Sequence, residues 1–176
     1  MTYFMNGVSE VINYPLALLV LASLGLFLGQ QPQRVLKFAL PFFMLAVLIG
    51  LMGTRARLLN GHFGLEALAL AGVMALSTVL YLKPSMSISV VVAILGGLVL
   101  GLVVKPFLLP GFMGFKVYST FAGVIFSALL VLMGVAGFTL FLKRFWDGVL
   151  VRAVASWIVA SVLMILVLSA TKVLKL

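Results

Sequence analysis

Apolar residues run along this chain in long continuous stretches, which short polar or proline-containing segments interrupt. A helix crosses about 30 Å of hydrocarbon with roughly 20 residues, because each residue adds about 1.5 Å. Six stretches meet or approach this length, over residues 11–29, 35–53, 65–82, 88–104, 117–142 and 149–169. Their apolar positions are continuous rather than alternating, which is typical of helices and not of membrane barrels. The pattern predicts an all-α polytopic integral membrane protein with six transmembrane helices in one bundle, as a single domain over residues 1–176.

Prolines and glycines refine two of these stretches and one of the segments that connect them. Pro15 is suited to the opening turn of the first span, where a missing N–H costs nothing. Pro41 lies inside the second span and should kink it. The stretch KPFLLPGFMGFK, over residues 105–116, holds two prolines and two glycines, so it cannot form a regular helix. We expect an interfacial or re-entrant loop there.

Composition supports the membrane assignment and limits the chemistry. Charged residues make up 9% of the chain and hydrophobic residues 65%, whereas a soluble domain carries about 25% charged residues. There are three acidic residues, one histidine and no cysteine. Because most catalysis and metal binding depends on these residue types, we expect neither an enzyme nor a bound cofactor.

The positive charge is dispersed. The chain has a net charge of +9, but its twelve lysines and arginines stand in ones and twos between apolar runs. Nucleic-acid binding proteins gather such charge on one face, so we expect contact with the lipid bilayer and not with nucleic acid.

Charge does not decide the orientation of the six predicted spans. They place six basic residues on each side of the membrane: Arg34, Lys37, Lys83, Lys143, Arg144 and Arg152 on one, and Arg55, Arg57, Lys105, Lys116, Lys172 and Lys175 on the other. The first span has Glu10 before it and Arg34 and Lys37 after it, which favours both termini outside. The expected location is a bacterial inner (cytoplasmic) membrane.

Glu66 is the first candidate for chemistry, since an ionisable group at a membrane span is costly. It follows His62 at a spacing of four, so a helix would place both side chains on one face, as half of a metal site or as a proton-accepting pair. Alternatively, Glu66 lies in the first turn of its helix, where a carboxylate complements the helix dipole. The second interpretation is favoured, because two ligands cannot hold a metal ion.

Arg152 and Trp157 are the polar and aromatic candidates of the last span. Arg152 could bind an anionic lipid headgroup, or pair with Asp147 or Glu66. Alternatively, it extends towards the interface as an ordinary flanking residue. Trp157 is expected to pack as a wedge between helices rather than to hold a ligand.

Small residues recur at a spacing of four in three spans. The pairs are Gly25 with Gly29, Gly97 with Gly101, and Ser156 with Ala160. Such pairs let helices approach closely in membranes, where packing rather than hydrophobicity drives association. They predict helix-packing faces and imply no substrate.

Three stretches resemble the HupE/UreJ family of six-span membrane proteins, which are encoded with hydrogenase and urease accessory genes. They are LGLFLGQQPQRVLKFALPFFMLAVLIG over Leu24 to Gly50, GLEALALAGVMALS over Gly64 to Ser77, and VRAVASWIVASVLMIL over Val151 to Leu166. The resemblance implies six spans, and some members of the family are regarded as nickel or cobalt permeases.

The chain departs from the family at the positions of the suspected metal ligands. The family's first span usually opens with HPxxGxDH, and Glu10, Leu16 and Ala17 stand here at the His, Asp and His positions. In the family's HGxxHG pattern, Gly97 and Gly101 match the glycines, but Gly96 and Leu100 replace the histidines. The resemblance therefore implies a relative that keeps the packing scaffold without the metal ligands.

Two functions follow as expectations. The first is an accessory or structural subunit without catalytic activity, which packs through small-residue helix faces against another membrane protein or as a homo-oligomer. The second is a small-solute or transition-metal permease of the HupE/UreJ type, with His62 and Glu66 at its mouth.

Overall fold

The computed structural model describes residues 2–55, 63–82, 84–104, 114–146 and 148–173, and the regular elements in these ranges are helices. They are α1 Thr2–Asn13, α2 Pro15–Gln30, α3 Gln33–Arg55, α4 Gly64–Val79, α5 Met86–Val103, α6 Phe115–Trp146 and α7 Val149–Val173. The predicted all-α fold is confirmed. Residues 105–113 of the predicted loop, and His62, lie outside the described residues.

Within the described ranges, four helices are long and apolar enough to cross a membrane, namely α3, α5, α6 and α7. A fifth crossing results if α1 and α2, which are bent by 77° at their junction, count as one broken span. The sixteen residues of α4 extend over only about 24 Å, less than the hydrocarbon core. The structure therefore has the apolar helices of a membrane protein, but it does not confirm six spans.

The bend between α1 and α2 has a cause in the sequence. Pro15 has no N–H to donate to the carbonyl of Val11, and its ring disfavours the helical conformation of the residue before it. Tyr14 accordingly has extended dihedral angles, with φ −101° and ψ 97°. The helix predicted to begin near residue 11 thus begins at Pro15, and the residues before the bend form a separate helix, α1.

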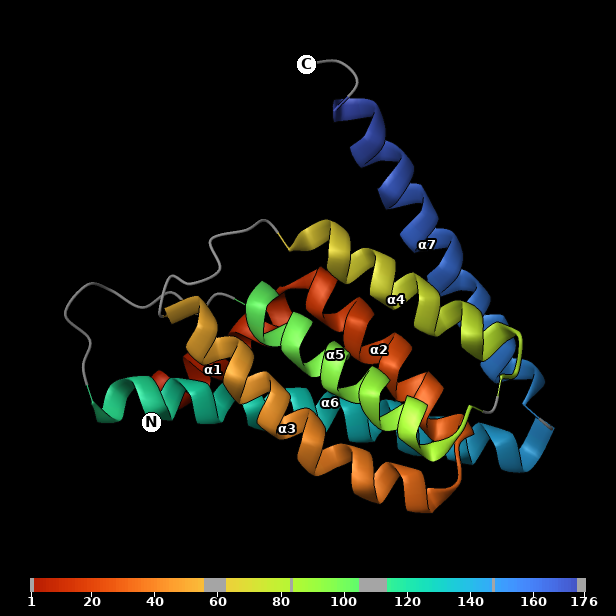
Figure 1. The fold of residues 1–176 in the computed structure, drawn as a ribbon, viewed down its shortest axis with the longest axis horizontal. Coiled ribbons are helices and arrows are strands. Elements are labelled where there is room, and N and C mark those ends of the chain that lie inside the picture. Colours follow the sequence, from red (N-terminus) through yellow and green to blue (C-terminus); the bar gives the residue numbers. More distant parts are fainter. Residues whose placement is uncertain (1, 56–62, 83, 105–113, 147, 174–176) are drawn as a thin grey trace.

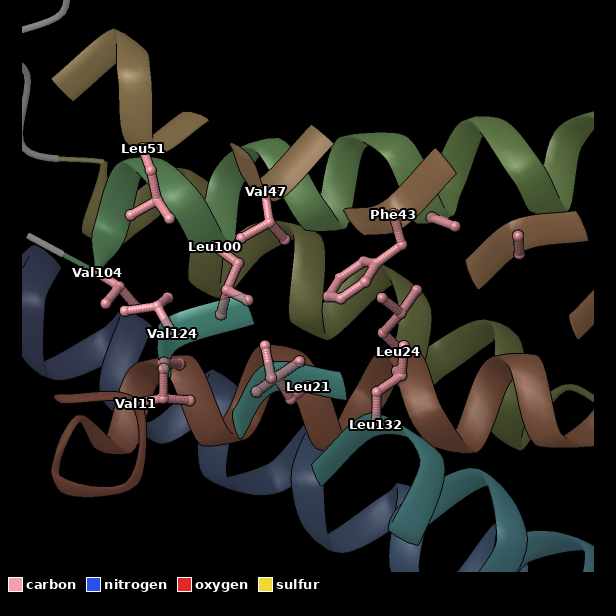
Figure 2. Packing of buried hydrophobic residues seen from close by; sticks show 14 of the residues in the cluster. Val11, Leu21, Leu24, Phe43, Val47, Leu51, Leu100, Val104, Val124 and Leu132 are labelled. Atoms are coloured by element: carbon pink, nitrogen blue, oxygen red, sulfur yellow. The ribbon is translucent and has the colours of Figure 1, made fainter. Parts of the chain in front are cut away.

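The helices pack around α2, which contacts α4, α5 and α6. In Figure 1, α3 and α5 lie side by side on one face, while α7 lies at an edge and its C-terminal half points away from the other helices. Figure 2 shows the core between them, where Leu21 and Leu24 of α2 lie between Phe43 of α3, Leu100 of α5 and Leu132 of α6. These side chains are buried.

Candidate functional site

A pocket of about 550 Å³ lies beside the bend between α1 and α2. Five helices contribute to it: the end of α1, the start of α2, the start of α4 and the ends of α5 and α7. Its lining residues are Glu10, Tyr14, Leu16, Phe63, Gly64, Leu65, Leu68, Leu102, Val103, Val104, Ile165 and Ser169. Its volume lies within the range of small-molecule sites.

Among the described residues of this lining, Glu10 is the one acidic side chain. It stands in the last turn of α1, where helix carbonyls lack intrahelical donors and the helix dipole adds negative potential. Within the described part of the chain, no hydrogen bond or ion pair engages its carboxylate. The pocket therefore has a concentrated negative potential at one wall.

The other walls are aromatic and aliphatic. Tyr14 and Phe63 present rings, and the leucines, valines and Ile165 make an apolar surface. Ser169 adds one hydroxyl, which donates to the carbonyls of Ile165 at 2.7 Å and Leu166 at 3.1 Å. Among the described residues, no group of three His, Cys, Asp or Glu side chains could hold a metal ion.

Glu66, the predicted candidate, lies outside the pocket lining, although its neighbour Leu65 belongs to it. It occupies the first turn of α4 and is exposed. This position suits the interpretation in which its carboxylate complements the helix dipole. The proposed pair with His62 cannot be placed, because His62 lies outside the described residues.

The residues that stand at the suspected ligand positions of the HupE/UreJ family lie either in the pocket lining or in the core. Glu10 and Leu16 both line the pocket, whereas Ala17 is fully buried. Gly96 packs against α2, since a Cβ built there would lie 3.2 Å from a methyl of Leu24. Leu100 is a core residue.

Gly97 and Gly101 lie at the contact between α5 and α3. A Cβ at Gly97 would be 2.7 Å from the carbonyl oxygen of Phe43, and one at Gly101 would be 2.5 Å from that of Val47. Gly50 completes the contact from α3, since its added Cβ would lie 2.9 Å from the Cα of Gly101. Backbone thus packs on backbone between these helices.

Gly25 and Gly29 face α6, where they make room for side chains of that helix. Added Cβ atoms would lie 2.8 Å from Val135 and 2.6 Å from Thr139, respectively. All four predicted glycines are buried within the chain. They join its own helices, so a partner cannot use them as an external docking face.

Ser156 and Ala160 differ from the glycines because both are exposed on α7. Trp157 beside them is 75% exposed, so it is not the internal packing wedge that we expected. Among the predicted small-residue pairs, only this one is accessible to a partner.

Arg152 stacks on an aromatic ring. Its guanidinium carbon lies 4.7 Å from the ring centroid of Tyr81, which follows the end of α4. Glu66 stands at the opposite end of α4, about 22 Å away along the helix, so the suggested ion pair between Arg152 and Glu66 is wrong. Asp147 lies outside the described residues.

Two features escaped the sequence analysis. The first is Gln30, which is buried and donates through Nε2 to the backbone carbonyl of Thr78 at 3.0 Å. The backbone carbonyl of Gln30 accepts a hydrogen bond from Nζ of Lys143 at 3.1 Å. These bonds join the ends of α2, α4 and α6, and the available signal was the pair Gln30-Gln31 at the end of an apolar run.

The second is the crossing of α1 and α6. A Cβ at Gly7 would overlap the carbonyl oxygen of Thr120, and one at Gly123 would overlap that of Phe4. Gly7 has Tyr3 and Val11 four residues away, whereas Gly123 has Ser119 and Ser127. The small-residue spacing is therefore present in α6 but absent from α1, so the spacing rule did not indicate this pair of helices.

Comparisons of the chain with protein-family models, with curated protein sequences and with solved structures found no match.

Proposed function

We propose that this chain is a non-catalytic integral membrane subunit that associates with a membrane partner, or with a second copy, through the outer face of α7. In this proposal the broken pair α1–α2 and the short helix α4 each count as one crossing, which with the four long helices gives six spans. An even number of spans puts both termini on one side, and the flanking charges favour the outside.

The observation that carries the proposal is the poor burial of α7. In the most apolar 18-residue stretch of α7, only 17% of the residues are buried, against 33% to 39% in the corresponding stretches of α3, α5 and α6. Its exposed surface includes Trp157, Met164 and Val167. A helix that contributes little to the core has most of its surface available to lipid or a partner.

The small residues favour a protein partner for this surface. Ser156 and Ala160 are small, exposed residues one turn apart on α7, and residues of this kind let a second helix pack closely. The Ser156 hydroxyl donates to the carbonyl of Ala153 at 2.7 Å, so it is already satisfied and adds no polar cost to an apolar contact. Trp157, the residue after Ser156, adds a large exposed ring.

Cysteine cross-linking in native membranes tests the proposal, because the chain has no cysteine of its own. We expect single cysteines at Ser156 or Ala160 to give one discrete adduct, either a disulfide-linked dimer or a conjugate formed through a maleimide-benzophenone reagent. Val91→Cys is the matched control, since Val91 is an exposed residue of α5. Equal cross-linking at all three positions would contradict a specific α7 interface.

The alternative is a small-solute or nickel/cobalt-like permease that resembles HupE/UreJ. The pocket beside a broken helix supports it, since discontinuous helices surround substrate sites in many carriers. Nickel accumulation in cells that express the chain, above that of cells with an empty vector, would favour the permease over the subunit.

A further inference from the structure

We infer that the pocket at the bend between α1 and α2 binds an alkylammonium group, with Glu10 as its counter-ion and the apolar walls around its hydrocarbon chain. Such a group occurs both in the amine headgroup of a lipid and in a free alkylamine. The inference does not rest on the proposed docking of α7.

The charge at the pocket selects for a cation. The carboxylate of Glu10 lines the cavity, and no described residue pairs with it. The carbonyls at the end of α1 reinforce its potential, because Pro15 cannot donate to the carbonyl of Val11. An anion would meet both the carboxylate and the negative end of the helix dipole.

The walls select for an organic cation over a bare metal ion. Metal sites need several ligating side chains, whereas the described residues of this lining offer a single carboxylate. The rings of Tyr14 and Phe63 can face an ammonium group, which aromatic faces attract. A cavity of about 550 Å³ also has room for a hydrocarbon chain beside Leu68, Val103 and Ile165.

The location suits an amphiphile. The pocket lies where α2 and α4 begin and where α5 and α7 end, so it sits at one end of the helices that surround it. In a membrane this level corresponds to the headgroups, where a lipid amine or an inserted alkylamine places its charge. The apolar walls then follow its chain towards the hydrocarbon.

The test is calorimetric titration of the purified full chain in a maltoside detergent at pH 7, with octylamine and octan-1-ol as probes. Octylamine is protonated at this pH, and octan-1-ol has the same chain without the charge. We expect Glu10→Gln to weaken octylamine binding by about tenfold or more, as for loss of a charge-assisted contact. Octan-1-ol should bind weakly to both proteins and not respond to the substitution.

Glu66→Gln is the matched control. It removes another carboxylate at the start of α4, next to Leu65 but outside the lining. Leu65→Trp is a second variant that narrows the cavity without removing charge, at a residue that is 50% exposed and so tolerant of substitution. We expect Glu66→Gln to bind octylamine like the wild type, and Leu65→Trp to bind it more weakly.

Native mass spectrometry identifies the source of the group. Wild-type protein that retains phosphatidylethanolamine over phosphatidylglycerol, with loss of this preference in Glu10→Gln, indicates a lipid headgroup. Octylamine binding without a lipid preference indicates a free amine, and both outcomes support the site. Absence of octylamine binding to the wild type, equal weakening by Glu10→Gln and Glu66→Gln, or octan-1-ol binding as tight as that of octylamine would overturn it.

Discussion

Helices α3 and α7 are equally hydropathic, yet the chain uses them differently. In α3, 39% of the residues in the most apolar 18-residue stretch are buried, and Gly50 brings the backbone of α3 against Gly101 of α5. In α7 the value is 17%, and the small residues Ser156 and Ala160 face outwards. Hydropathy therefore shows which helices suit lipid, while backbone-to-backbone contact shows which of them the chain itself holds together.

The difference also separates two uses of the same sequence signal. Small residues four apart occur in both α5 and α7. Those of α5 find a partner inside the chain, where the gain comes from close packing of backbone atoms. Those of α7 have none within the described residues, which is why this helix is the one we assign to association.

The largest expected effect is at the α3–α5 contact. In Gly101→Ala the new methyl would meet the carbonyl oxygen of Val47 at 2.5 Å and the backbone nitrogen of Leu51 at 2.9 Å. Because backbone cannot move aside as a flexible side chain can, we expect a loss of about 3 kcal/mol in the free energy of unfolding. Unfolding by SDS, followed by circular dichroism in mixed micelles, measures this loss.

Gly137→Ala is the control for that experiment. Gly137 lies in α6, and a Cβ there would have no neighbour within 4 Å. Alanine should stabilise this helix by up to about 1 kcal/mol, because glycine is the poorer helix former. If both substitutions change stability alike, the close contact between α3 and α5 is not what holds these helices together.

A smaller effect is expected at the inner face of α7. Val162 is 1% exposed, and one of its methyls would lie 3.2 Å from a Cβ built at Gly72 of α4. Val162→Ala should cost about 1 kcal/mol through lost packing. Val167→Ala, at a residue that is 61% exposed on the same helix, should leave the unfolding free energy unchanged. An equal cost at the two positions would mean that α7 packs by another face.

The smallest expected effect concerns the start of α7. Arg152→Gln removes the cation that stacks on Tyr81, and we expect a cost of about 0.5 kcal/mol, as for exposed cation–π pairs. Arg152→Lys keeps a cation at this position and should recover part of the loss. The same SDS titration measures both variants. A larger loss of unfolding free energy in Arg152→Lys than in Arg152→Gln would exclude a cation–π contribution.

The sequence predicted the helices more reliably than their junctions. Continuous apolar runs led to the all-α fold, because each run must satisfy its backbone hydrogen bonds internally in lipid. Helix α1 was not predicted, since its polar residues Asn6, Ser9 and Glu10 interrupt the apolar pattern at the chain's start. Pro15 marked a helix start and accounts for the break before it, but nothing in the local sequence indicates that α1 then packs against α6.

The site was harder to find for the same reason. Glu66 drew attention because it lies within an apolar run, whereas Glu10 seemed to belong to a polar flank. The pocket forms only because the bend brings the end of α1 to residues of α4, α5 and α7 that are distant in sequence. Likewise, the hydrogen bond from Lys143 to Gln30 joins residues far apart in the chain, and no local spacing indicates it.

The crossing of α1 with α6 has a consequence for biosynthesis. Gly7 fits against the backbone at Thr120, a residue made more than a hundred positions later. At translation rates of about 5 to 20 residues per second, roughly 5 to 20 s pass between the synthesis of α1 and that of Thr120 in α6. Helix α1 therefore reaches its final place long after its own synthesis, and during that interval it depends on the lipid surface or on the insertion machinery.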